Sequence, residues 1–222
     1  MAQTKRTDHQ RVGAKGRQTE QTIKDAARKV FARDGYLNAR ITDIADEAGK
    51  SPATLYNYFD NKKEILGALL EDFLEYVLDE GDDAEPLDEY TSESLRSAVA
   101  TFWRAYTEFI PELVGVTHAA TTDPDFVQVW MQIREVGVRK IGARIKILQA
   151  EGATDPNLNP YVAASALSSM LEHSCYLWLG TNAQGTGRPA SDDQAIDTIS
   201  YLWSHALGIT EPRSDGPRRA RT

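Results

Sequence analysis

The spacing of apolar residues limits the fold of this chain more than any other feature. Apolar side chains recur every three or four positions through almost every segment. This is the period of an α-helix with one buried face, and no alternating pattern of useful length indicates a strand. The sequence therefore predicts an all-α protein. The predicted helices cover 19–34, 42–49, 52–58, 62–80, 92–109, 111–120, 126–150, 160–179 and 192–207.

Local signals mark where the first three helices begin and end. Gly35 follows the first helix, at the position where glycine commonly ends one. The hydroxyl of Thr42 can cap the start of the second helix. Ser51 is a capping residue for the third helix, and Pro52 occupies its first position, where the missing N–H has no cost. Three helices thus fit within a short stretch.

Charge is distributed unevenly along the chain, whose net charge is −8. Residues 1–67 carry 13 Lys and Arg against 9 Asp and Glu, whereas residues 68–222 carry 12 against 24. A compact basic block on an acidic protein is typical of a DNA-binding domain attached to a separate sensing domain. A purely solubilising role for this asymmetry is the alternative.

Residues 40–66 indicate a helix-turn-helix, because two short helices are joined by a tight turn at Ala48-Gly49-Lys50. In such a pair the second helix places its N-terminal residues in the major groove of DNA. Its outward positions carry hydroxyl, amide and aromatic groups, whereas a merely solvated helix would carry Glu and Lys. The outward residues are Ser51, Ala53, Thr54, Tyr56, Asn57 and Tyr58.

Each outward side chain has a contact that it can make with DNA. Asn57 can pair with adenine through two hydrogen bonds, Thr54 can reach a base edge or a phosphate, and Ala53 can touch a thymine methyl group. Phosphate contacts fix the register without reading sequence. They are expected from Thr42, Tyr56, Tyr58 and Lys62. The alternative for Tyr56 is packing against the first helix.

The same stretch resembles the N-terminal signature of the TetR (tetracycline repressor) family. The resemblance rests on Phe31-x-x-x-Gly35-Tyr36, on Thr42, Ile44-Ala45, Ala48-Gly49 and Ser51, and on Thr54-Leu55-Tyr56-x-Tyr58-Phe59-x-x-Lys62-x-x-x-Leu66. The chain departs from the family pattern at Lys50, where a small apolar residue is common, and at 61–63, where Asn-Lys-Lys replaces Ser-Lys-Glu. Lys50 adds a possible phosphate contact. The resemblance implies a DNA face of Thr42, Ser51, Ala53, Thr54, Tyr56, Asn57, Tyr58 and Lys62.

The predicted domain order has four parts. A flexible basic arm covers 1–18, the helix-turn-helix domain 19–66, a helical ligand-binding and dimerisation domain 67–209, and a disordered tail 210–222. The arm carries five Lys and Arg and one Asp, so it can follow phosphates or enter the minor groove. An unstructured solubilising tail is the alternative, and the same two interpretations apply to the Arg-rich C-terminal tail.

Aromatic residues are abundant in the second domain, which predicts a pocket for a mostly apolar small-molecule effector. The expected lining is Phe102, Trp103, Tyr106, Phe126, Trp130, Ile133, Met170, His173 and Trp178. Aromatic stripes at helical spacing also build ordinary cores, which is the alternative.

The last two helices carry more apolar surface than one buried face requires, which indicates an interface. TetR-family members pair these helices across a two-fold axis, so the resemblance implies a homodimer. The expected interface residues are Leu167, Leu171, Ile199, Leu202 and Trp203. Burial within one subunit is the alternative.

No catalytic constellation, metal motif or phosphate-binding loop is present in the sequence, so no enzyme activity, cofactor or metal is predicted. The polar N-terminus and the lack of a long apolar run predict a cytoplasmic protein without membrane contact.

The expected function is that of a homodimeric repressor which binds a palindromic double-stranded DNA operator and is released by its effector. Release would follow a shift of the helix predicted over 62–80. An activator of the same fold is the first alternative, and a helical small-molecule-binding protein or enzyme is the second.

Overall fold

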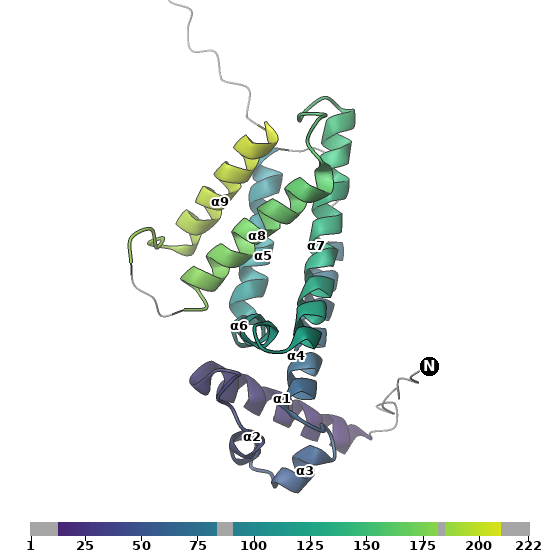
Figure 1. The fold of residues 1–222 in the computed structure, drawn as a ribbon, viewed down its shortest axis with the longest axis vertical. Coiled ribbons are helices and arrows are strands. Elements are labelled where there is room, and N and C mark those ends of the chain that lie inside the picture. The colour runs from purple at the N-terminus through teal and green to yellow at the C-terminus, as the bar shows by residue number, and fades with distance from the viewer. Residues whose placement is uncertain (1–12, 84–90, 182–184, 210–222) are drawn as a thin grey trace, which may run out of the picture. The chain divides into compact units, whose positions relative to one another are not determined.

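The computed structural model describes residues 13–83, 91–181 and 185–209 (Figure 1). Within these ranges all regular structure is helical, which confirms the predicted all-α class. The helices are α1 Ala14–Asp34, α2 Ile41–Glu47, α3 Pro52–Tyr56, α4 Lys62–Asp83, α5 Ser92–Glu108, α6 Ile110–Ala120, α7 Pro124–Ala150, α8 Pro160–Trp178 and α9 Asp192–Leu207. The bounds predicted for α9 are confirmed. Residues 1–12 of the predicted arm, residues 84–90 after α4 and the predicted tail 210–222 lie outside the described residues.

The chain divides into two compact units. Unit 1 comprises Met1–Phe73 and Ile110–Phe126, and unit 2 comprises Leu74–Phe109 and Val127–Thr222. Unit 1 therefore contains α1, α2, α3, the first half of α4 and α6. The sequence analysis placed the segment of α6 in the second domain by chain order. In the structure α6 belongs to unit 1 and packs against α1, although α5 and most of α7 belong to unit 2.

The core of unit 1 forms around the apolar face of α1. Ile23, Ala27 and Val30 are completely buried, and α2 and α6 both pack against this helix. Gly35 ends α1 as predicted, with a positive φ of 76° and its N–H donated to the Phe31 carbonyl at 3.0 Å. A residue with a side chain would adopt that backbone conformation only at a cost.

The starts of α2 and α3 test the predicted caps. The Thr42 cap is wrong, because α2 begins one residue earlier and the carboxylate of Asp43 accepts the backbone N–H of Arg40 at 3.1 Å. The Ser51 cap is confirmed, since its hydroxyl accepts the N–H of Thr54 at 3.2 Å and Pro52 occupies the first helical position. Asp43, at the third helical position, thus accepts the N–H of the residue before the helix, as the acidic residue of a capping box does.

The core of unit 2 is built where α8 and α9 pack against α5. Trp103 from α5 and Trp203 from α9 are almost fully buried. Arg96 on α5 pairs with Asp197 on α9 at 2.6 Å, and Arg134 on α7 pairs with Glu172 on α8 at 2.7 Å. No helix among the described residues is long and apolar enough to cross a bilayer.

Candidate nucleic-acid interface

A small apolar core fixes the geometry of α2 and α3. Ile44, Ala45 and Leu55 have no exposed surface, and Phe59 is 3% exposed. Gly49 in the connecting turn has a φ of 62°, and the next N–H, from Lys50, is donated to the Ala45 carbonyl at 2.9 Å. The two short helices therefore hold each other in the arrangement that the sequence predicts for a helix-turn-helix.

The opposite side of α3 is accessible to a ligand. Ser51, Ala53 and Asn57 are exposed, and Tyr56 is 54% exposed, which is unusual for a large aromatic side chain. Thr54 and Tyr58 are partly exposed. The alternative that Tyr56 packs into the core is therefore not what the structure shows.

Thr42 on α2 and Lys50 in the turn are also exposed, and Lys62 is partly exposed, so all nine predicted DNA-contacting residues lie at exposed or partly exposed positions. Ser51 and Thr54 bond to each other through their hydroxyls at 2.9 Å. These two side chains therefore present a preordered pair of hydroxyl groups at the start of α3.

Lys62 occupies a different environment from the other predicted residues. Its ammonium donates to the carbonyl oxygens of Tyr36 at 2.7 Å, Leu37 at 2.9 Å and Ala39 at 3.0 Å, and it lies 4.6 Å from the centre of the Tyr36 ring. Burial lowers the pKa of this ammonium. All three N–H groups already have acceptors, so a phosphate would have to compete with three carbonyls. The predicted phosphate contact of Lys62 does not fit this geometry, because the side chain fixes the α1–α2 loop.

Arg40 is an accessible cation that the sequence analysis missed. It lies exposed at the start of α2, two residues before Thr42. The signal was a positive charge directly before the predicted helix, where it can reach a phosphate near Thr42. Leu37, in the preceding loop, is 50% exposed and had no sequence signal that set it apart.

The residues predicted to line an effector pocket do not all gather in one unit. Trp103, Tyr106 and Ile133 are buried in unit 2, where Trp103 and Trp178 lie with ring centres 6.2 Å apart. Phe102, Trp130, Met170 and Trp178 are half-buried there. Phe126 belongs to unit 1 and packs edge-on against Tyr36, and His173 is exposed on α8.

The predicted interface residues are mostly inside the protomer. Leu167, Leu171, Ile199 and Trp203 are all less than 9% exposed, because α8 and α9 turn these faces toward the core that they share with α5. Leu202 is the exception, at 47% exposed. Large apolar side chains that are exposed on α8 and α9 are Tyr161, Val162, Leu177, Tyr201 and Leu202.

These features define a class of proteins: all-α regulators with a helix-turn-helix. Residues 23–69 match the family model described as bacterial regulatory proteins, tetR family. The chain is 29% identical over 142 residues to the HTH-type transcriptional repressor KstR2 of Rhodococcus jostii, a match that covers 57% of this chain and 68% of that protein. It is 25% identical over 193 residues to the HTH-type transcriptional activator FasR of Mycolicibacterium smegmatis, covering 85% and 83%.

A crystal structure of a tetR-family regulatory protein from Rhodococcus RHA1 has the same fold. It superposes with a TM-score of 0.70 at 21% identity, covering 87% of this chain and 98% of that protein. The match of residues 23–69 to the tetR family model confirms the resemblance seen in the sequence of this region.

Proposed function

We propose that this protein is a homodimeric transcriptional repressor that binds a palindromic operator through α3 of each subunit and is released by a mostly apolar effector. The observation that carries the proposal is the outer side of α3. Its exposed hydroxyl, amide and aromatic groups are presented by a helix whose inner residue, Leu55, is completely buried. A helix held this firmly keeps its outward side chains in a fixed register for the major groove.

DNA selected by the protein from a randomised duplex pool would provide the binding site for the test. Asn57→Ala should weaken binding by about 1–3 kcal/mol and relax preference at one base pair, as expected for a residue that reads a base edge. Lys50→Gln should weaken binding to all sequences and reduce the slope of log affinity against log salt by about one. Fluorescence anisotropy at several salt concentrations measures both effects.

The matched controls lie in unit 2, on α7. Gln132→Ala removes an exposed amide and Lys140→Gln neutralises an exposed lysine, and neither should change DNA binding. Equal losses in the control and α3 variants would contradict the proposed face. Failure of the wild type to enrich any sequence would favour a helical small-molecule-binding protein instead.

The exposed surface of α8 and α9 supports dimerisation. Val162, Ala166, Ser169, His173 and Leu177 follow one another at helical spacing along α8, and all are exposed. Tyr201 on α9 is 61% exposed and its neighbour Leu202 is 47% exposed. A second copy of the chain would cover this surface in a symmetric contact, which also suits two equivalent half-sites in the DNA.

Leu202→Glu should therefore shift the protein from dimer to monomer in sedimentation velocity, because a charge would be buried in the contact. Met131→Glu on α7 is the control, since Met131 is 49% exposed. A Leu202→Glu protein that remains dimeric would place the contact elsewhere.

Effector binding is proposed for the aromatic core of unit 2. Trp103 Nε1 and Ser168 Oγ are buried there and have no hydrogen-bond partner within the described part of the chain. Trp103 Nε1 lies on a ring whose centre is 6.2 Å from that of Trp178, and an unpaired polar atom in such surroundings suits a ligand with an apolar body and one polar group. A compound series graded in polarity, tested for release of bound DNA, would overturn this proposal if only highly charged compounds acted.

The direction of regulation is the remaining part of the proposal. The relative named as a repressor supports repression, and the relative named as an activator supports the alternative. A reporter gene under the selected site should be silenced when the protein is present and expressed when Asn57→Ala replaces it. Higher expression with the wild type would make the protein an activator of the same fold.

A further inference from the structure

Helix α6 has an unusual place in the chain. The chain leaves unit 2 at Phe109, forms α6 within unit 1 and returns to unit 2 at Val127. Two of the three chain crossings between the units therefore flank this one segment, and α6 packs against α1. The contacts that hold α6 within unit 1 are therefore of interest for the frame of the helix-turn-helix.

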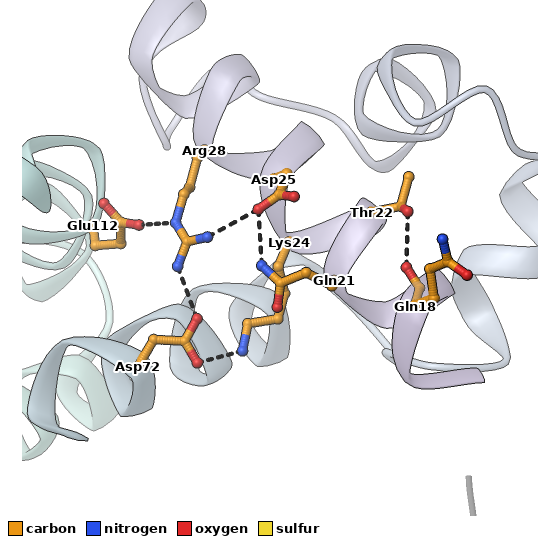
Figure 2. Close-up of polar contacts among 8 residues, drawn as sticks. All are labelled: Gln18, Gln21, Thr22, Lys24, Asp25, Arg28, Asp72 and Glu112. Carbon is orange, nitrogen blue, oxygen red and sulfur yellow. Dashed lines mark hydrogen bonds and ion pairs between the residues drawn. The ribbon is translucent and has the colours of Figure 1, made fainter. Parts of the chain in front are cut away.

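One charged contact holds the start of α6. Glu112 has no exposed surface, and its Oε1 accepts from Nε of Arg28 on α1 at 2.6 Å (Figure 2). The same guanidinium donates to Asp72 on α4 at 2.8 Å and to Asp25 on α1 at 3.1 Å. Lys24 also pairs with Asp72. Arg28 thus joins three helices of unit 1 through one side chain.

A second charged contact holds the segment that follows α6. The ammonium of Lys63, on the first turn of α4, donates to Asp123 at 2.9 Å and to Asp125 at 2.7 Å. Lys63 stands where the family pattern has an acidic residue, so this contact follows from a departure already visible in the sequence. An acidic side chain at 63 would repel both aspartates.

The middle of α6 packs closely against Leu66 and Tyr36 at Gly115. A Cβ atom added at Gly115 would lie 3.4 Å from Leu66 Cδ1 and 3.5 Å from Tyr36 Cβ. Tyr36 is the residue whose carbonyl accepts from Lys62. The adjacent lysines 62 and 63 therefore tie the start of α4 to the α1–α2 loop and to the end of the α6 segment, respectively.

We propose that Arg28 and Lys63 are positioning residues that hold α6 at both ends, and that specific DNA binding by α3 depends on these two contacts. The inference rests on the proposed DNA-binding function. α2 packs on α1, and α3 runs into α4 through a short turn, so α1 and α4 form the frame of the helix-turn-helix. Loosening α6 from that frame would let the α2–α3 pair shift as a whole relative to α1 and α4.

The test asks whether neutralising Asp123 and Asp125 raises or lowers the affinity for DNA. Removing negative charge from a DNA-binding unit ordinarily leaves DNA affinity unchanged or raises it, because repulsion of phosphates falls. The proposal predicts the opposite for the double variant Asp123→Asn with Asp125→Asn, which should bind the selected duplex about fivefold or more weakly. Its affinity for unrelated duplexes should not fall. Glu71→Gln, at an exposed position of α4, is the matched control and should not weaken binding.

Two further variants separate positioning from general damage. Lys63→Met should weaken specific binding, and adding both asparagine substitutions to it should cause no further loss. The exchange Lys63→Asp with Asp125→Lys should recover part of the specific affinity. Glu112→Gln should act like the aspartate variants if it folds, as judged by circular dichroism.

The outcomes are distinct. Weaker specific binding in the aspartate variants, with recovery on charge exchange, would support the proposal. Unchanged or tighter binding, as in Glu71→Gln, would overturn it and leave the proposed function intact. Failure of the wild type to select any duplex would instead overturn the proposed function on which it rests.

Discussion

The carboxyl groups on the α6 segment differ in what surrounds them. Glu112 is fully buried, and burial raises its pKa although the hydrogen bond from Arg28 opposes this. Asp123 is at the surface, and the hydrogen bond from Lys63 lowers its pKa. Two acidic residues on one segment therefore make opposite contributions to the pH dependence of stability.

The sign of each contribution follows from proton linkage. Because the pKa of Glu112 is raised in the folded state, this residue stabilises the protein at pH values below its ordinary pKa of 4.5. That stabilisation is lost as the pH rises through the pKa of the folded state. Because the pKa of Asp123 is lowered in the folded state, this residue stabilises the protein at pH values above its ordinary pKa of 3.8. That stabilisation is lost as the pH falls through the pKa of the folded state.

Substitution of Glu112 and substitution of Asp123 should therefore change the free energy of unfolding with opposite dependence on pH. The stability of Glu112→Gln relative to the wild type should increase as pH is raised above about 4.5 toward neutrality. Asp123→Asn should be less stable than the wild type at neutral pH, and this deficit should shrink as the pH falls below about 4. Urea unfolding at a series of pH values measures both, and parallel profiles would contradict the assignment.

At the scale of elements, the turn between α2 and α3 depends on the backbone conformation of Gly49. Gly49→Ala should destabilise the protein by about 1 kcal/mol or more, because a side chain disfavours its positive φ. Gly137→Ala should instead stabilise by about 0.5–1 kcal/mol, since this glycine lies inside α7 with open space at its Cβ position. Thermal unfolding of both variants gives the comparison, and equal signs would contradict it.

Sequence signals located most helices because caps and apolar spacing are local. Ser51 and Pro52 marked the start of α3 correctly, whereas Thr42 did not mark that of α2 because Asp43 caps it instead. The exposed positions on α3 were predictable because its apolar residue Leu55 marks the buried side of the helix. The role of Lys62 was not, since its three acceptors lie 23 to 26 residues earlier in the chain.

The same reason explains the errors in unit 2. Surplus apolar residues on α8 and α9 indicated an interface, but the pattern did not show which face the protomer covers with its own α5. Leu171 and Trp203 turned out to be core residues, and Tyr201 is exposed instead. An amphipathic pattern shows that one face of a helix is covered. Only the packing of the folded chain shows whether another helix of the same protomer or a second molecule covers it.

At the scale of the whole molecule, the basic N-terminal block provides less charge for DNA than its composition suggests. At least six of its cations are engaged by carboxylates or carbonyls within unit 1, namely Lys24, Arg28, Lys29, Arg33, Lys62 and Lys63. Exposed cations such as Arg40 and Lys50 remain among the described residues, and the sequence carries further cations at Lys5, Arg6 and Arg11, which lie outside them.

A protein that begins at Gly13 should therefore bind DNA more weakly than the full chain. Loss of three cations that contact phosphates would reduce the slope of log affinity against log salt by up to about three. Anisotropy titrations of both proteins at matched salt concentrations measure the slope. An unchanged slope would show that the arm does not contact DNA and would leave the solubilising interpretation.

The discontinuous composition of unit 1 has a consequence for how the protein is made. Arg28 and its buried partner Glu112 are 84 positions apart in the chain. On the ribosome, which releases the N-terminus first, the helix-turn-helix segment emerges long before α6 does. Until about 126 residues have left the exit tunnel, α1 lacks one of its packing partners, α6. The nascent helix-turn-helix segment therefore stays incompletely folded until this later helix has been synthesised.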